Sequence, residues 1–346
     1  MFQGRLLLPA FALGGLLLLS GCASDGAQKH YDLGKGLYYQ GKYAEAEKEF
    51  HEAIRLKPDW AEAHFNLGVS LKEHWKYPEA EREFREAIRL TPDYAEAHYN
   101  LGNVFWNSGR YAEAEREYRV VIRLMANHAE AHFNLADVLW QQGKNEEVID
   151  EYREVIRLKP DDADAHNLLG EALSEKGETA EATKEYREAI RLVPGYVEAH
   201  DNLGMVLWQQ GKPDEAIKEW REAIRLEPYG FNARSNLCSV LGWQKKTEEQ
   251  IDEYREVIRL KPDDAWAYNN LGVALRKKGK TEEAEKEFRE AIRLAPDDAV
   301  MLEDLAMLLD AKGERKEARG FWERALKVAK DPELVERIKK RLAEPR

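Results

Sequence analysis

Histidine and asparagine return together in this sequence at an interval of 34 residues. The segment AEAHFNLG at 61–68 recurs as AEAHYNLG at 95–102 and as AEAHFNLA at 129–136. A row of histidines is a candidate metal site, and a row of asparagines, which offer both hydrogen-bond donors and acceptors, is a candidate peptide-binding site. The same residues could instead be packing residues copied by duplication. The elements that carry them decide between these interpretations.

The histidines stand at position 4 of successive 34-residue blocks, counted with residue 61 as position 1. They are His30, His64, His98, His132, His166 and His200. Neighbouring helices lie about 8–10 Å apart, so one histidine per repeat is too widely spaced for the compact shell of a zinc ion. The row continues as Arg234, Tyr268 and Leu302, which a packing position tolerates. We therefore predict packing, with no metal and no cofactor.

The 34-residue period divides residues 27–332 into nine blocks. Positions 4, 7, 8 and 11 share one face of a first helix, and positions 20, 24 and 27 share one face of a second. Glycine marks the turn between the two helices, and proline follows the second. Asp59 and Asp93, each followed three residues later by Glu, are expected to cap the next first helix. One helix pair cannot bury its apolar face alone, so the pairs must stack.

This pattern resembles the tetratricopeptide repeat (TPR), whose copies are also 34 residues long. The resemblance covers residues 27–332, nearly all of the chain after the apolar N-terminus. It implies an all-α fold, namely a right-handed superhelical solenoid of nine TPR helix-turn-helix repeats. Residues 333–346 form an amphipathic segment that we expect to be a capping helix; a docking helix for a partner is the alternative.

A polar and aromatic stripe follows the first helices on the side turned away from the packed face. In TPR superhelices this stripe lines the concave surface, and its asparagines resemble the ladder in the TPR superhelix of O-linked N-acetylglucosamine transferase. Repeats about 10 Å apart match three residues of an extended chain. The predicted groove residues are Asn66, Asn100, Asn134, Asn202, Asn236 and Asn270 at position 6, Phe65, Tyr99 and Phe133 at position 5, and Trp106, Trp140 and Trp208 at position 12.

Acidic residues edge this stripe, so the expected ligand is a protein or extended peptide of neutral or basic character. The alternative is that the stripe packs between neighbouring first helices or descends unchanged from duplication. With 53 basic and 65 acidic residues, the net charge of −12 excludes a phosphate-neutralising surface, and we predict no nucleic-acid partner. An open groove also argues against a small-molecule substrate.

The N-terminus has a different composition from the repeats. Residues 1–21 carry one charge and an apolar run, followed by Cys22 in the sequence LSGC. This resembles a bacterial lipoprotein signal, which implies cleavage before Cys22, a lipid on Cys22 and a lipidated linker over 22–26. Ala23 implies the outer membrane of the cell envelope, with the chain facing the periplasm. The alternatives are an ordinary secretory signal or an uncleaved anchor, with Cys22 incidental.

These features predict a membrane-anchored periplasmic scaffold that binds a protein or peptide and assists envelope or secretion-complex assembly. The second hypothesis is an intracellular TPR adaptor or co-chaperone without a lipid anchor. The third is an enzyme, which we disfavour because no nucleophile with a base, phosphate-binding loop or metal shell stands out from the repeat pattern.

Overall fold

The computed structural model describes residues 12–343, with side chains from residue 25 onwards. These residues form nineteen helices and no strand. The helices are α1 (Ala12–Tyr39), α2 (Tyr43–Leu56), α3 (Ala61–Glu73), α4 (Tyr77–Leu90), α5 (Ala95–Asn107), α6 (Tyr111–Leu124), α7 (Ala129–Gln141), α8 (Asn145–Leu158), α9 (Ala163–Glu175), α10 (Thr179–Leu192), α11 (Val197–Gln209), α12 (Pro213–Leu226), α13 (Phe231–Trp243), α14 (Thr247–Leu260), α15 (Ala265–Lys277), α16 (Thr281–Leu294), α17 (Ala299–Ala311), α18 (Arg315–Val328) and α19 (Pro332–Ala343).

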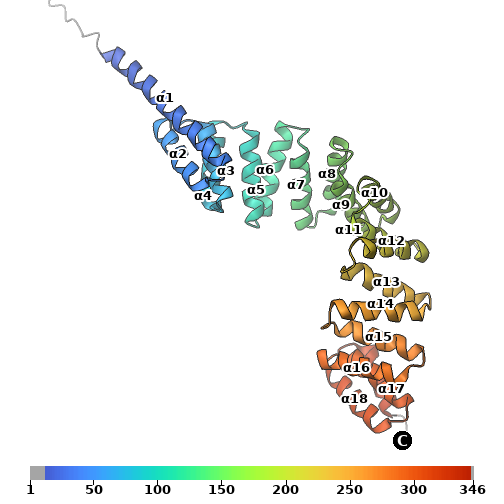
Figure 1. Cartoon of the computed structure of the whole chain (residues 1–346). Coiled ribbons are helices and arrows are strands. Elements are labelled where there is room, and N and C mark those ends of the chain that lie inside the picture. Colours follow the sequence, from blue (N-terminus) through green and yellow to red (C-terminus); the bar gives the residue numbers. More distant parts are fainter. Residues whose placement is uncertain (1–11, 344–346) are drawn as a thin grey trace, which may run out of the picture. The chain divides into compact units, whose positions relative to one another are not determined.

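Consecutive helices form hairpins, and within each compact unit the hairpins stack on one another (Figure 1). Thus α3 packs on α4, and α4 in turn packs on α5. The chain divides into two compact units, and the division falls after Ala172 in α9. Each unit is a run of such hairpins. The described residues confirm the prediction of an all-α solenoid of nine helix pairs.

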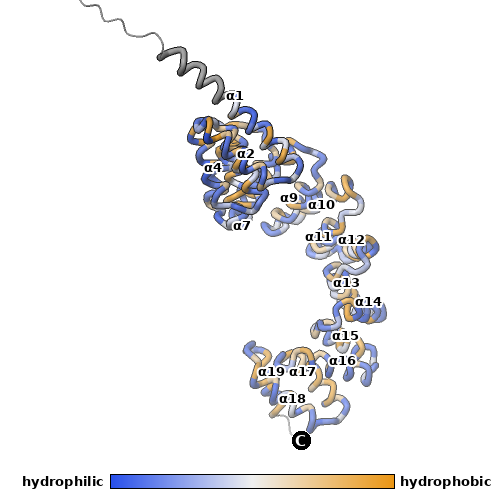
Figure 2. Tube along the Cα trace, turned by 60° about the vertical axis from the view of Figure 1, so that its left-hand side comes forward, coloured by the Kyte–Doolittle hydropathy of each residue, from blue (hydrophilic) through white to orange (hydrophobic). Residues whose placement is uncertain are grey.

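The core of each hairpin pairs a large ring at position 24 with a small residue at position 8. Phe84 is fully buried, and a Cβ added to Gly68 would lie 2.8 Å from its Cε1 atom. Trp220 has the same relation to Gly204. Apolar residues therefore recur at helical spacing along the helices, which Figure 2 shows as hydrophobic stretches between hydrophilic ones. Cys238 takes the place of this glycine in the seventh repeat and is fully buried.

The turn between the two helices of a repeat requires a left-handed backbone at position 15. Seven glycines occupy it with φ between 69° and 86°, but Trp75 (φ 62°) and Lys245 (φ 59°) adopt the same conformation. A side chain in this conformation costs about 1–2 kcal/mol. Two of the nine turns therefore lack the glycine that the left-handed conformation favours.

The capping prediction for Asp59 and Asp93 was wrong. The residue that precedes α3 is Trp60, and no side chain caps that helix. At the start of a first helix, aspartate acts as a cap one position later in the block: Asp264 accepts a hydrogen bond from the amide of Ala267 at 3.0 Å. An aspartate one residue earlier lies outside the N-cap position, whose side chain reaches the free amides of the first turn.

The last helix, α19, covers the apolar end of the stack. Leu334 and Ile338 are buried in the core of the last repeats, and α19 packs on α18. Arg337 forms two hydrogen bonds of 2.6 Å with Glu303, whose side chain is only 4% exposed. These contacts agree with the expected capping helix, because the apolar side of α19 is used within the chain.

At the other end, α1 begins at Ala12 and continues without interruption into the first repeat. Residues 22–26, expected to be a linker, are therefore helical. The first part of the predicted signal peptide, residues 1–11, lies outside the described residues. Within residues 12–343 no helix is both long and apolar enough to span a bilayer. Cleavage and lipidation at Cys22 stay predictions.

Candidate functional site

The histidines at position 4 lie between the two helices of a repeat and contact two acceptors. His98 Nδ1 lies 2.6 Å from Oε2 of Glu117, and its Nε2 lies 3.0 Å from the carbonyl oxygen of Pro92. The same two contacts, to the Glu 19 residues later and to the carbonyl six residues earlier, recur at His64, His132 and His200. We call this arrangement the position-4 clamp.

The clamp favours a cation, because both of its partners accept hydrogen bonds and only a protonated imidazole has two N–H groups. The hydrogen bond to Glu151 raises the pKa of His132. In the seventh repeat Arg234 takes the place of histidine and donates to Glu253 at 2.5 Å and to the carbonyl of Pro228 at 3.1 Å. The packing prediction is confirmed for the buried histidines His64, His98, His132, His166 and His200, whereas His30 in the first repeat is partly exposed. Both ring nitrogens of a clamp histidine face protein oxygens.

The predicted asparagines are half-buried on the first helices, and several of their amides are already bonded. Asn66 donates to the hydroxyl of Tyr31 at 2.9 Å and to the carbonyl of Glu62 at 2.8 Å. Asn134 likewise donates to Tyr99 at 3.0 Å, across the seam between neighbouring first helices.

The other asparagines follow the same trend. Asn236 donates to Asp201 at 3.0 Å, whereas Asn100 donates to the carbonyl of Glu96 at 2.9 Å and accepts from Lys72. Asn202 also has an interaction within the chain, while Asn270 has no side-chain hydrogen bond in the described part. From the sequence, each amide was expected to offer a ligand both a hydrogen-bond donor and an acceptor. At Asn66 and Asn134 the donors are used, so mainly the side-chain carbonyl is available.

The position-5 aromatics pack against the ring at position 24 of their own hairpin. Ring centroids are 5.9 Å apart for Phe65 and Phe84 and 5.7 Å apart for Phe133 and Tyr152. Tyr99 and Phe133 also line a small hollow of about 120 Å³ beside Asn134. Part of the alternative interpretation therefore holds: these rings contribute to packing as well as to the surface.

The predicted tryptophans of the first unit lie around one larger cavity. Trp106 and Trp140 line a cavity of about 310 Å³ together with Asp137, Tyr152 and Glu171. We call it the Trp140 cleft. It lies on the first helices α5, α7 and α9, with Tyr152 supplied by α8. Aromatic faces beside carboxylates attract cationic groups.

The Asp137 carboxylate of this cleft is held in place by a hydrogen bond. The hydroxyl of Tyr152 donates to Oδ1 of Asp137 at 2.8 Å. Burial raises the pKa of Asp137, and this hydrogen bond opposes the shift. A half-buried carboxylate with one fixed partner and a free oxygen gains by accepting a hydrogen bond from a ligand.

A second cavity of about 300 Å³, the Trp75 cleft, shares Trp106 with the first. Its other lining includes Lys72, Trp75, Tyr77 and Asn103. Trp75 is 78% exposed at the strained turn described above. The two clefts together follow the first helices of repeats two to five.

Other predicted residues are not part of these clefts. Phe65 and Asn66 lie in the same unit but line neither cavity. Trp208 belongs to the second unit, where its ring packs edge-on against Trp243 at 5.2 Å. Tyr152 and Trp75 line these clefts but were not among the groove residues predicted from the sequence. Tyr152 was assigned to the core by its position 24, and only its hydroxyl, absent from Phe84 and Phe288, signals a polar role.

Comparisons with known proteins agree with this architecture. The model described as TPR repeat matches residues 30–74, 76–109, 136–177, 170–211 and 244–277. Two models described as tetratricopeptide repeat match residues 263–331 and residues 95–128 and 197–229. No curated protein matches the sequence.

Several solved structures are similar in fold. The C-terminal part of a TPR repeat-containing protein from Cytophaga hutchinsonii is 15% identical, with a TM-score of 0.61 over 70% of this chain and 99% of that one. PilF of Pseudomonas aeruginosa is 19% identical, with a TM-score of 0.51 over 62% and 97% of the two chains. YrrB, described as a TPR protein with an unusual peptide-binding site, is 22% identical, with a TM-score of 0.50 over 53% and 95%. At these identities the likeness concerns the fold alone. Because the family models match more than half of the sequence, the chain belongs to the tetratricopeptide repeat family.

Proposed function

We propose that this protein is a membrane-anchored periplasmic scaffold that binds a protein or an extended neutral or basic peptide along its first helices. TPR proteins bind peptides or proteins and are generally non-catalytic scaffolds. The observation that carries the proposal is the Trp140 cleft, in which two indole rings and two carboxylates surround one cavity. Such a cavity suits a Lys or Arg side chain, because the rings and the carboxylates both favour a cation.

The mode of binding differs from a symmetrical asparagine ladder. Since the amide donors of Asn66 and Asn134 are used across the seam, we infer that the ladder mainly accepts hydrogen bonds from the ligand backbone. Side-chain recognition then falls to the Trp140 and Trp75 clefts. A ligand with basic residues spaced along an extended chain meets these requirements.

The anchor and its location rest on the sequence around Cys22. The apolar run and the LSGC motif support lipidation of Cys22, and Ala23 supports the outer membrane of a bacterial envelope, with the repeats in the periplasm. A scaffold held at that membrane suits the assembly of envelope or secretion complexes.

Site-specific photocrosslinking tests the groove. A photoreactive residue in place of Trp140 should capture a partner, whereas one in place of Arg116, exposed on α6, should not. Trp140→Ala should weaken partner binding about tenfold or more, as for an aromatic hot spot. Trp266→Ala, which removes an exposed tryptophan of the second unit, is the matched control. Capture from Arg116 but not from Trp140 would refute the groove.

Labelling with radioactive palmitate tests the anchor separately. The wild-type chain should incorporate the label and float with membranes, and Cys22→Ala should do neither. A Cys22→Ala chain that still labels contradicts lipidation at Cys22. An unlabelled wild-type chain that still captures a partner through Trp140 would favour the intracellular adaptor.

A further inference from the structure

The eighth repeat departs from the position-4 clamp. Tyr268 stands at position 4, so that position supplies no imidazole or guanidinium to Glu287, the carboxylate of position 23. Within the described part of the chain Glu287 has no hydrogen bond or ion pair, and no side chain donates to the carbonyl of Pro262. They are the equivalents of Glu253 and the carbonyl of Pro228, the two acceptors that Arg234 contacts in the seventh repeat.

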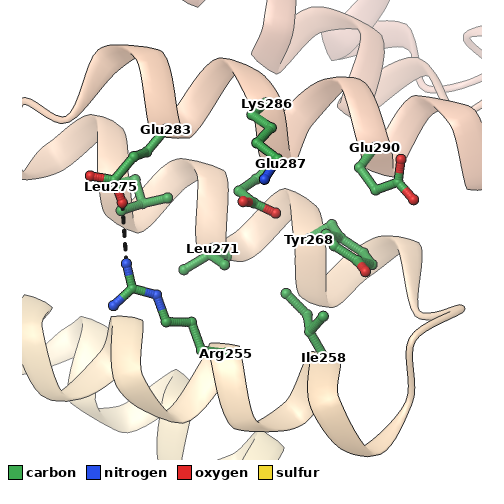
Figure 3. Close-up of a pocket in the computed structure, with 9 residues that line it drawn as sticks. All are labelled: Arg255, Ile258, Tyr268, Leu271, Leu275, Glu283, Lys286, Glu287 and Glu290. Carbon is green, nitrogen blue, oxygen red and sulfur yellow. Dashed lines mark hydrogen bonds and ion pairs between the residues drawn. The ribbon is translucent and has the colours of Figure 1, made fainter.

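A cavity of about 380 Å³ opens at this place between α14 and α16 (Figure 3). Its apolar lining includes Ile258 from α14 and Leu271 from α15. Figure 3 shows Glu287 in the middle of the cavity, between the Arg255–Glu283 pair on one side and Tyr268 on the other. We call it the Glu287 cleft.

The other carboxylates around the cleft have partners. Glu283 pairs with Arg255 at 3.1 Å, and Glu290 pairs with Arg293 at 2.7 Å. Lys286 and Arg255 also line the cleft, and their charges act on Glu287, but neither forms an ion pair with it among the described residues. Burial raises the pKa of the Glu287 carboxyl and outweighs the opposing charges of Lys286 and Arg255.

We propose that the Glu287 cleft binds an arginine side chain of a partner protein, whose guanidinium bridges Glu287 and the carbonyl of Pro262. Arg234 shows that a guanidinium satisfies this pair of acceptors in the adjacent repeat. The planar guanidinium suits two acceptors at once, and the apolar lining suits the methylene groups of the stem. The volume lies at the lower end of the range for binding pockets.

This site is separate from the groove. It uses positions 4 and 7 of α15, which face the second helices, whereas the groove uses positions 5, 6 and 12 of the first helices. The two sites use different helix faces and lie in different units, so variants can test each one separately.

Saturation-transfer NMR with the full-length chain and N-acetylargininamide tests the inference. Wild-type protein should bind this probe saturably, and the uncharged N-acetylcitrullinamide at least about tenfold more weakly. Glu287→Gln should weaken binding of the arginine probe about tenfold. Tyr268→Arg should abolish it, because the new side chain occupies the cleft from within as Arg234 does. Glu282→Gln, at an exposed position of the same helix, should leave binding unchanged.

Any of four results would overturn the inference. One is the absence of saturable binding to wild type up to about 20 mM probe, where even a weak charge-assisted contact is measurable. Another is equal binding of the two probes, or unchanged affinity in both cleft variants. The last is loss of binding in Trp140→Ala but not in Glu287→Gln, which would place the probe in the groove and support the proposed function alone. Circular dichroism should show that Tyr268→Arg is folded, since it restores the clamp.

Discussion

The position-4 clamp makes stability depend on pH in a direction that the structure fixes. In the fourth repeat His132 contacts Glu151 at 2.6 Å and the carbonyl of Ala126 at 3.3 Å, and its side chain is 7% exposed. The hydrogen bond to Glu151 raises the folded pKa of His132 above its ordinary value. The clamp therefore contributes fully below pH about 6.5 and is lost as the pH rises through the folded pKa.

Replacing His132 by Leu removes both hydrogen bonds and leaves the Glu151 carboxylate, 18% exposed, without its cation. We expect the free energy of unfolding to fall by about 2 kcal/mol at pH 6. This is the typical cost of removing a charge-assisted hydrogen bond when its buried partner is left unsatisfied. The loss should shrink as the pH rises towards 8.5, because the wild-type imidazole loses its proton as the pH passes through the folded pKa of His132. His132→Arg should keep the clamp at both pH values, because Arg234 does so in the seventh repeat.

Amide hydrogen exchange read by mass spectrometry suits this test, because a repeat array can open locally. Protection of α7 and α8 should fall between pH 6 and pH 8.5 in wild type after correction for intrinsic exchange, and should stay constant in His132→Arg. His51→Arg, at an exposed position of α2 outside any clamp, is the matched control. Equal pH dependence in wild type and His132→Arg, or an equal cost of His132→Leu at both pH values, would refute the reasoning.

Two further predictions concern the backbone and the core. Lys245→Gly should stabilise the protein by about 1 kcal/mol, because φ is 59° at this position and glycine adopts that conformation without strain. Lys246→Gly is the control and should not stabilise, because φ is −80° there. Urea denaturation measures both variants. Gly68→Val should destabilise by about 2 kcal/mol, because a Cβ would lie 2.8 Å from the ring of buried Phe84, whereas Gly36→Ala, with open space around it, should cost nothing or stabilise. The same urea titration distinguishes these outcomes, and an equal loss in both glycine variants would contradict the packing argument.

The fold was predictable because its signal is repeated. Three features recur every 34 residues: a large ring that packs against a small residue, a left-handed turn, and a helical hairpin that stacks on its neighbour. A single departure such as Trp75 therefore did not obscure the pattern. Contacts between repeats were less accessible. The bond from Asn134 to Tyr99 depends on how neighbouring first helices approach each other, which a period of 34 does not specify. The groove face was therefore predicted, but not that its amide donors are used within the chain.

The clamp was missed for a different reason. His98 and Glu117 recur at a fixed separation of 19 residues, so the pairing signal was present, but burial of an ion pair could be inferred only once the two helices were placed. The carbonyl of Pro92 carries no side-chain signal at all. By size alone, Arg234 and Tyr268 are equally acceptable replacements for histidine at position 4.

Chemically, those two replacements are opposites. Arg234 keeps both contacts of the clamp, so its repeat needs nothing from outside, whereas Tyr268 removes the cation and leaves Glu287 beside a cavity. Trp75, like Tyr268, replaces the usual residue without restoring its role. Its φ of 62° costs about 1–2 kcal/mol relative to glycine, and its exposed ring lines a cleft. In a duplicated chain the other copies define what each position needs for folding. A departure that leaves a carboxylate unpaired, or holds an aromatic ring in a strained turn, therefore marks the surface where a partner can supply the missing contact.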